Sequence, residues 1–132
     1  MPHKGLPPRD PKVWLEFAAS NLVCARSVLP GMRLEDHCFN AQQAAEKAVK
    51  AVFIRHSISF PYVHELERLL KLLEQNAIKV PKYVWKAMDL SRFAIETRYP
   101  GMSGPITKRE YRRLLRIAES VVRWAERQVA KS

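Results

Sequence analysis

The neighbouring residues Arg98 and Tyr99, together with His64, are the side chains of this sequence best suited to chemistry on a phosphodiester. Metal-free RNA cleavage needs one group that takes the 2′-hydroxyl proton and one cation that stabilises the phosphorane. Histidine titrates near neutral pH, and arginine can bond two phosphate oxygens at once. We therefore take Arg98 and His64 as candidate catalytic residues, and Tyr99 as a candidate for stacking on a base or nucleotide.

The same residues also have structural interpretations. Arg98 is expected near a helix C-terminus, where it could bond the last carbonyls or pair with Glu46 or Glu96. His64 precedes a predicted helix, so it could cap the backbone or pack on Tyr62. The sequence leaves both interpretations open beside the catalytic one.

A second group of polar residues follows the helical spacing i, i+3, i+4, i+7 within an apolar segment. One interpretation is a solvent-facing stripe in which Glu46 and Lys50 form an i,i+4 ion pair. The other interpretation is the lining of a dimer cleft or nucleotide site, and only the family resemblance described below favours it. The four residues are Gln43, Glu46, Lys47 and Lys50.

The last predicted helix concentrates positive charge. Residues 107–131 hold eight basic and three acidic residues, a difference that is half of the net charge of +10. Such a cluster could bind RNA phosphates or an acidic partner, although charge runs also serve as solvated helix faces. Its candidate phosphate-binding residues are Arg109, Arg112, Arg113 and Arg116.

Helices are the elements that must position these side chains. Apolar residues recur at spacings of three and four, no strand-like alternation of useful length occurs, and Pro and Gly mark the breaks. Asp10-Pro11 predicts one helix start, and the capping box Thr107 to Glu110 predicts another. We expect a single all-α domain, an antiparallel bundle of about five helices over 10–131, preceded by a flexible lead-in, 1–9. The predicted helices span 10–29, 35–56, 66–76, 80–99 and 107–131, with the second one central.

Composition limits the functional classes. An apolar content of 47% with only four glycines predicts a compact fold, and the net charge favours polyanionic partners. No apolar run is long enough to cross a bilayer and the first residues do not resemble a secretory signal, so we expect a cytoplasmic protein with no membrane partner. Cys24 and Cys38 lie on apolar stretches without zinc-site spacing, so we expect buried, reduced thiols, no metal and no cofactor.

Three segments carry a family resemblance. Residues 39–51 read FNAQQAAEKAVKA and resemble the QQAAEKAxKA centre of HEPN domains. Residues 60–66, FPYVHEL, are similar to that family's HxL entry into its third helix, and residues 94–101, AIETRYPG, to its RYP turn. The order and spacing match, and the resemblance extends over roughly residues 10–128.

This resemblance implies a prokaryotic helical bundle that commonly forms homodimers and is often paired with a small nucleotidyltransferase. In such toxin–antitoxin pairs, the HEPN member is a metal-independent endoribonuclease in which four to six residues separate an Arg from the His that follows it. This chain departs from that motif, because the corresponding positions after Arg98 are Ser103, Gly104 and Pro105.

Three functions are therefore open. The first, which we favour, is the toxin-like, RNA-acting component of a prokaryotic two-component system with a nucleotidyltransferase, with enzyme status undecided. The second is a non-catalytic module that binds nucleotide or RNA. The third is a helical adaptor whose basic face holds a nucleotidyltransferase partner.

Overall fold

The computed structural model describes residues 9–63, 65–96 and 105–131, and side chains outside 94–96 within those ranges. Its described residues form helices without a β-strand, as predicted. The elements are α1 (Pro11–Arg26), α2 (Leu34–Arg55), α3 (Leu66–Gln75), α4 (Lys82–Trp85), α5 (Met88–Glu96) and α6 (Lys108–Ala130). None of these helices is both long enough and apolar enough to cross a membrane.

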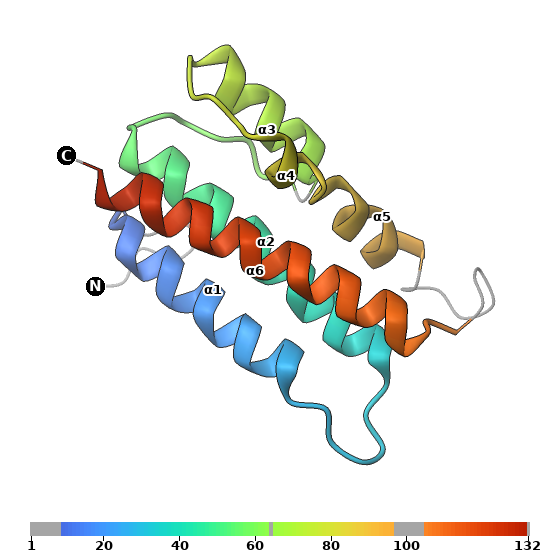
Figure 1. Cartoon of the computed structure of the whole chain (residues 1–132). Helices are drawn as coiled ribbons and strands as arrows, with labels where there is room; N and C mark the ends of the chain where they lie inside the picture. The colour runs from blue at the N-terminus through green and yellow to red at the C-terminus, as the bar shows by residue number, and fades with distance from the viewer. Residues whose placement is uncertain (1–8, 64, 97–104, 132) are drawn as a thin grey trace.

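Helix α2 is the centre of the bundle, as the sequence predicted, and contacts α1, α3, α5 and α6 (Figure 1). Small side chains explain this position, because they allow neighbouring helices to approach closely. Ala41, Ala44, Ala48 and others on α2 are fully buried. Helix α1 runs antiparallel to both α2 and α6, whereas α2 and α6 end together. At that shared end Nε of Arg55 donates to the carbonyl of Val129 at 3.3 Å.

The predicted starts of α1 and α6 are confirmed in atomic detail. Asp10 accepts a hydrogen bond from the backbone N–H of Lys12 at 2.9 Å, and Pro11 occupies the first turn. Both bonds of the capping box are present on α6: the N–H of Glu110 donates to Thr107 Oγ1 at 3.1 Å, and the N–H of Thr107 donates to Glu110 at 3.3 Å. Each cap satisfies donors that a helix N-terminus leaves unpaired.

Two predicted boundaries are wrong. The first helix ends at Arg26 rather than near residue 29, because the backbone of Ser27 leaves the helical conformation (φ −87°, ψ 75°). The side chain of Ser27 also donates to the carbonyl of Val23 at 2.6 Å. Leu29, the last residue of the predicted helix 10–29, therefore lies beyond α1 and is 59% exposed. The predicted helix 80–99 is divided into α4 and α5 at a turn in which the N–H of Asp89 donates to Lys86 O, three residues back, at 3.0 Å.

Candidate functional site

The catalytic candidates Arg98 and His64, and the stacking candidate Tyr99, lie outside the described residues. The helices next to these residues in the sequence, α3 and α5, pack against each other. The backbone N–H of Leu66, the first residue of α3, donates to Oγ of Ser91 on α5 at 3.0 Å. Their assignment as site residues therefore remains a prediction.

The polar residues of α2 do not form a solvent-facing stripe. Nζ of Lys50 lies 2.9 Å from Oε2 of Glu46, and the two side chains are only 8% and 4% exposed. Nε2 of Gln42 donates to the same carboxylate at 3.1 Å, and Gln43 donates to Gln42 at 2.8 Å. The result is a hydrogen-bonded chain of four side chains, the α2 polar network, in which Gln42, Glu46 and Lys50 are buried and Gln43 is partly buried. Gln42 was not anticipated from the sequence.

The lysine end of the α2 polar network reaches an aromatic cluster. Nζ of Lys50 lies 5.4 Å from the centroid of the Phe60 ring, a cation–π distance. Phe60 in turn meets Trp14 and Phe53 edge to face, with centroid distances of 5.8 and 5.5 Å. The ion pair therefore lies inside the bundle and ties α2 to the segment that follows it.

Lys47 belongs to a different set of contacts. Its Nζ donates to Oδ1 of Asn21 on α1 at 2.8 Å and lies 5.7 Å from the centroid of Phe17. Nδ2 of Asn21 then donates to Asn40 at 3.2 Å. The four α2 residues predicted as one site are thus divided, with Lys47 facing α1 and the others joined to Lys50.

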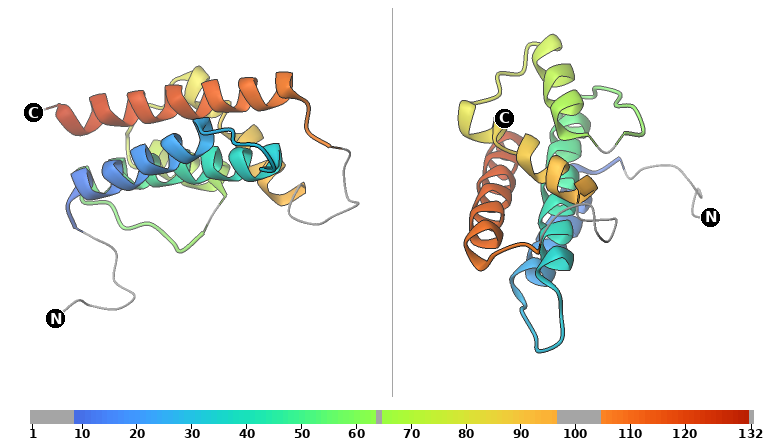
Figure 2. Two further views of the ribbon diagram at one scale, coloured as in Figure 1. Left: turned by 90° about the horizontal axis from the view of Figure 1, so that it is seen from below. Right: turned by 90° about the vertical axis from the view of Figure 1, so that its right-hand side faces the viewer.

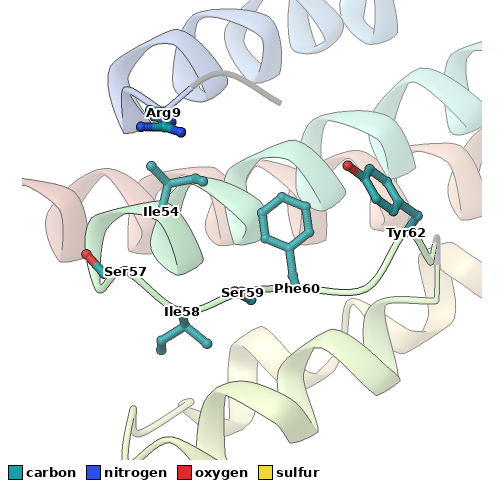
Figure 3. A pocket seen from close by; sticks show the side chains of 7 residues that line it. All are labelled: Arg9, Ile54, Ser57, Ile58, Ser59, Phe60 and Tyr62. Atoms are coloured by element: carbon teal, nitrogen blue, oxygen red, sulfur yellow. The ribbon is translucent and has the colours of Figure 1, made fainter. Parts of the chain in front are cut away.

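A pocket of about 420 Å³ lies where α2 passes into the next segment (Figure 3). Its character is mainly apolar and aromatic, with Tyr62 75% exposed at one end and the guanidinium of Arg9 at the other. The residues that line this aromatic pocket are Arg9, Ile54, Ser57, Ile58, Ser59, Phe60 and Tyr62. The two views of Figure 2 place this segment and α6 on opposite sides of α2.

The arginines of the last helix are arranged as predicted. Arg109, Arg112, Arg113 and Arg116 are all on the surface of α6, and their spacing places them on one side, the α6 basic face. Arg113 is partly neutralised, since its Nη1 lies 3.0 Å from Oδ2 of Asp89 on α5.

A second pocket, of about 330 Å³, opens beside this face between α6 and the α4–α5 turn. We call it the lysine–arginine pocket. Its lining residues are Tyr83, Lys86, Asp89, Arg113, Arg116, Ile117 and Ser120. Sequence reasoning missed Tyr83 and Lys86, because their approach to α6 depends on the break between α4 and α5.

The two cysteines differ, contrary to the expectation that both are buried. Cys24 is exposed, whereas Cys38 is buried. Burial, with smaller contributions from Glu35 and Glu110, raises the pKa of Cys38 to about 12. Its thiol is therefore protonated at neutral pH and is a poor nucleophile. The described residues contain no group of three or more His, Cys, Asp or Glu side chains placed to hold a metal ion.

The described geometry defines an all-helical bundle with a buried polar network on its central helix and a basic last helix. The chain matches the HEPN domain family model over residues 11–128, and it belongs to that family. It is similar to the crystal structure of TT1696 from Thermus thermophilus, with 30% identity, a TM-score of 0.78 and coverage of 89% of this chain and 97% of that one.

It is also similar to ST0689, described as an archaeal HEPN homologue, with 26% identity and a TM-score of 0.74. That match covers 91% of this chain and 98% of ST0689. No curated protein matches the chain.

Proposed function

We propose that this HEPN chain binds RNA through the α6 basic face and is the toxin-like, RNA-acting component of a prokaryotic pair with a nucleotidyltransferase. The observation that supports the proposal most strongly is the position of Arg109, Arg112, Arg113 and Arg116 together on one side of α6. Arginine forms charge-assisted hydrogen bonds with phosphate oxygens and releases the counterions that surround a nucleic acid. A row of surface arginines at helical spacing suits a phosphate backbone better than it suits a small neutral ligand.

Binding of a labelled RNA, followed by fluorescence anisotropy over a range of salt concentrations, tests this proposal. We expect the logarithm of the affinity to fall linearly with the logarithm of the salt concentration, because each phosphate contact releases counterions. Four arginine contacts correspond to a slope near −3 to −4 for a single strand or duplex (about −0.7 to −0.9 per contact). The proposal fails if the folded protein does not bind RNA at low salt, or if its affinity is independent of salt.

The ribonuclease hypothesis depends on Arg98 and His64 and is separate from RNA binding. It predicts that the protein cleaves a tRNA pool in the presence of EDTA and that Arg98→Ala abolishes cleavage. An intact pool after incubation with folded protein that binds RNA would rule out this activity and leave the non-catalytic binding role.

The adaptor alternative uses the same α6 basic face against an acidic nucleotidyltransferase surface. A competition experiment between RNA and the nucleotidyltransferase tests whether both bind this face. If the face holds RNA, added RNA should displace a bound nucleotidyltransferase. Simultaneous binding of both would place the partner elsewhere on the bundle.

Apolar side chains exposed on α1 and after it support the proposal of a homodimer. Large apolar side chains that a single chain leaves in solvent are candidates for burial at a subunit interface. The exposed residues are Phe17, Val23, Val28, Leu29, Met32 and Phe39.

We expect a dimer by sedimentation, and we expect Val23→Glu to shift it toward monomer without loss of helix content. Val23 is 60% exposed, so the folded monomer should tolerate the change. A monomeric native protein, or a variant that remains fully dimeric, would contradict this interface.

A further inference from the structure

The lysine–arginine pocket brings together polar groups from three consecutive elements and from α6. Tyr83 lies on α4, Lys86 follows it in the α4–α5 turn, and Asp89 lies on α5. Arg116 and Ser120, one helical turn apart, line the pocket from α6. The pocket is therefore built by the fold and does not arise from one helix surface alone.

The charges in this pocket are unbalanced. Its cations are Lys86, Arg113 and Arg116, and its carboxylate is Asp89, which pairs with Arg113 at 3.0 Å. Among the described residues, neither Lys86 nor Arg116 has an ion-pair partner. Two cations thus line a shared recess in which no carboxylate of the described residues lies within ion-pair distance of either one.

A hydroxyl group at the pocket wall is oriented by a further cation. Nη2 of Arg127 donates to the hydroxyl oxygen of Tyr83 at 2.9 Å. Because that oxygen acts as an acceptor toward Arg127, its own hydrogen is available to another acceptor. Ser120 supplies a second hydroxyl to the same pocket.

We propose that the lysine–arginine pocket binds a phosphate group, with Lys86 and Arg116 as its charged ligands and Tyr83 as a hydroxyl donor. Two cations and a hydroxyl donor match the charge and the acceptor oxygens of phosphate. A volume of about 330 Å³ is at the small end of ligand pockets and leaves room for a nucleoside next to the phosphate. Arg9 is the one cation among the described residues that line the aromatic pocket, so several cations do not converge there.

Two kinds of ligand carry the phosphate group that this pocket would bind. It can be one phosphate of the RNA strand bound by the α6 basic face, in which case this inference rests on the proposed function. It can also belong to a free nucleotide, in which case the pocket acts independently of RNA. Arg113 and Arg116 belong to both the face and the pocket, and this continuity favours the RNA strand.

The test uses the full chain and three probes: inorganic phosphate, AMP and a labelled RNA. Calorimetry with the first two and anisotropy with the third are compared for the native protein, Lys86→Ala, Tyr83→Phe and the control Arg68→Ala. Arg68 is an exposed cation on α3, away from the pocket lining. Lys86→Ala should weaken the binding of each probe about tenfold or more, since it removes a charged hydrogen-bond donor. Tyr83→Phe should weaken it several-fold, and Arg68→Ala should leave phosphate and AMP unchanged.

The results of these titrations distinguish the phosphate pocket from the proposed RNA binding by the α6 basic face. If phosphate and AMP bind through Lys86 but RNA does not bind, the pocket stands with a free nucleotide as its ligand and the proposed function fails. If RNA binds equally well to the native protein and Lys86→Ala, the proposed function stands and the pocket is not a phosphate site for the strand. Absence of phosphate and AMP binding, together with RNA affinity unaffected by Lys86→Ala, overturns the phosphate pocket altogether.

Discussion

Replacement of Glu46 by alanine should lower the free energy of unfolding by about 3–5 kcal/mol, the largest stability effect that we expect from a single polar side chain here. The substitution removes the partner of Lys50 while the ammonium group remains in a site where its side chain is only 8% exposed. It also removes the acceptor for Gln42. Urea denaturation followed by circular dichroism measures the change.

Glu67 and Lys71 on α3 provide a matched control, because they form an ion pair with the same i,i+4 spacing at 3.1 Å. Their side chains are 48% and 62% exposed, so Glu67→Ala should cost no more than about 0.5 kcal/mol. Equal effects of Glu46→Ala and Glu67→Ala would contradict burial of the first pair. If Glu46→Ala does not fold, the double variant Glu46→Leu/Lys50→Met should recover folding, since an apolar pair leaves no charge unpaired.

Removal of two arginines from the α6 basic face should lower RNA affinity about 100-fold. Arg109→Ala/Arg112→Ala deletes two charged donors, and each lost phosphate contact corresponds to roughly a tenfold change. The slope of log affinity against log salt should become shallower by about two. Anisotropy with labelled RNA measures both quantities.

Arg68→Ala/Lys79→Ala is the control for this variant. Arg68 lies on α3 and Lys79 follows that helix, and the double substitution changes the net charge by the same amount. We expect only a small loss of affinity from this control. Equal losses in the two double variants would mean that net charge, and not the α6 basic face, governs RNA binding.

The helices that were predicted most accurately are those whose ends depend on local chemistry. The capping box Thr107 to Glu110 and the Asp10-Pro11 start are read from neighbouring residues, and the structure contains the expected hydrogen bonds. The predicted end of α1 was wrong because the apolar spacing continues through Leu29, beyond the last helical residue. Periodicity cannot distinguish a buried apolar residue from an exposed one in the following loop.

The site was less predictable because burial depends on distant segments. The spacing of Glu46 and Lys50 suggested an ion pair only as part of a solvent-facing stripe, whereas the pair is buried. The aromatic ring that Lys50 contacts, Phe60, comes from the segment after α2. Lys47 follows Glu46 directly and still contacts α1 instead. Lys86 is a candidate phosphate ligand only because the turn between α4 and α5 places it beside α6, and the sequence did not predict that turn.

Photochemical cross-linking of a 4-thiouridine RNA to the native protein, with the attachment sites identified by mass spectrometry, tests the central claim most directly. RNA binding through the α6 basic face predicts cross-links concentrated in the first half of α6 and in the α4–α5 turn near Lys86. The views of Figure 2 show that the segment of the aromatic pocket lies across α2 from α6, so the two locations are readily distinguished. Cross-links concentrated around Phe60 and Tyr62, with none on α6, would contradict the account.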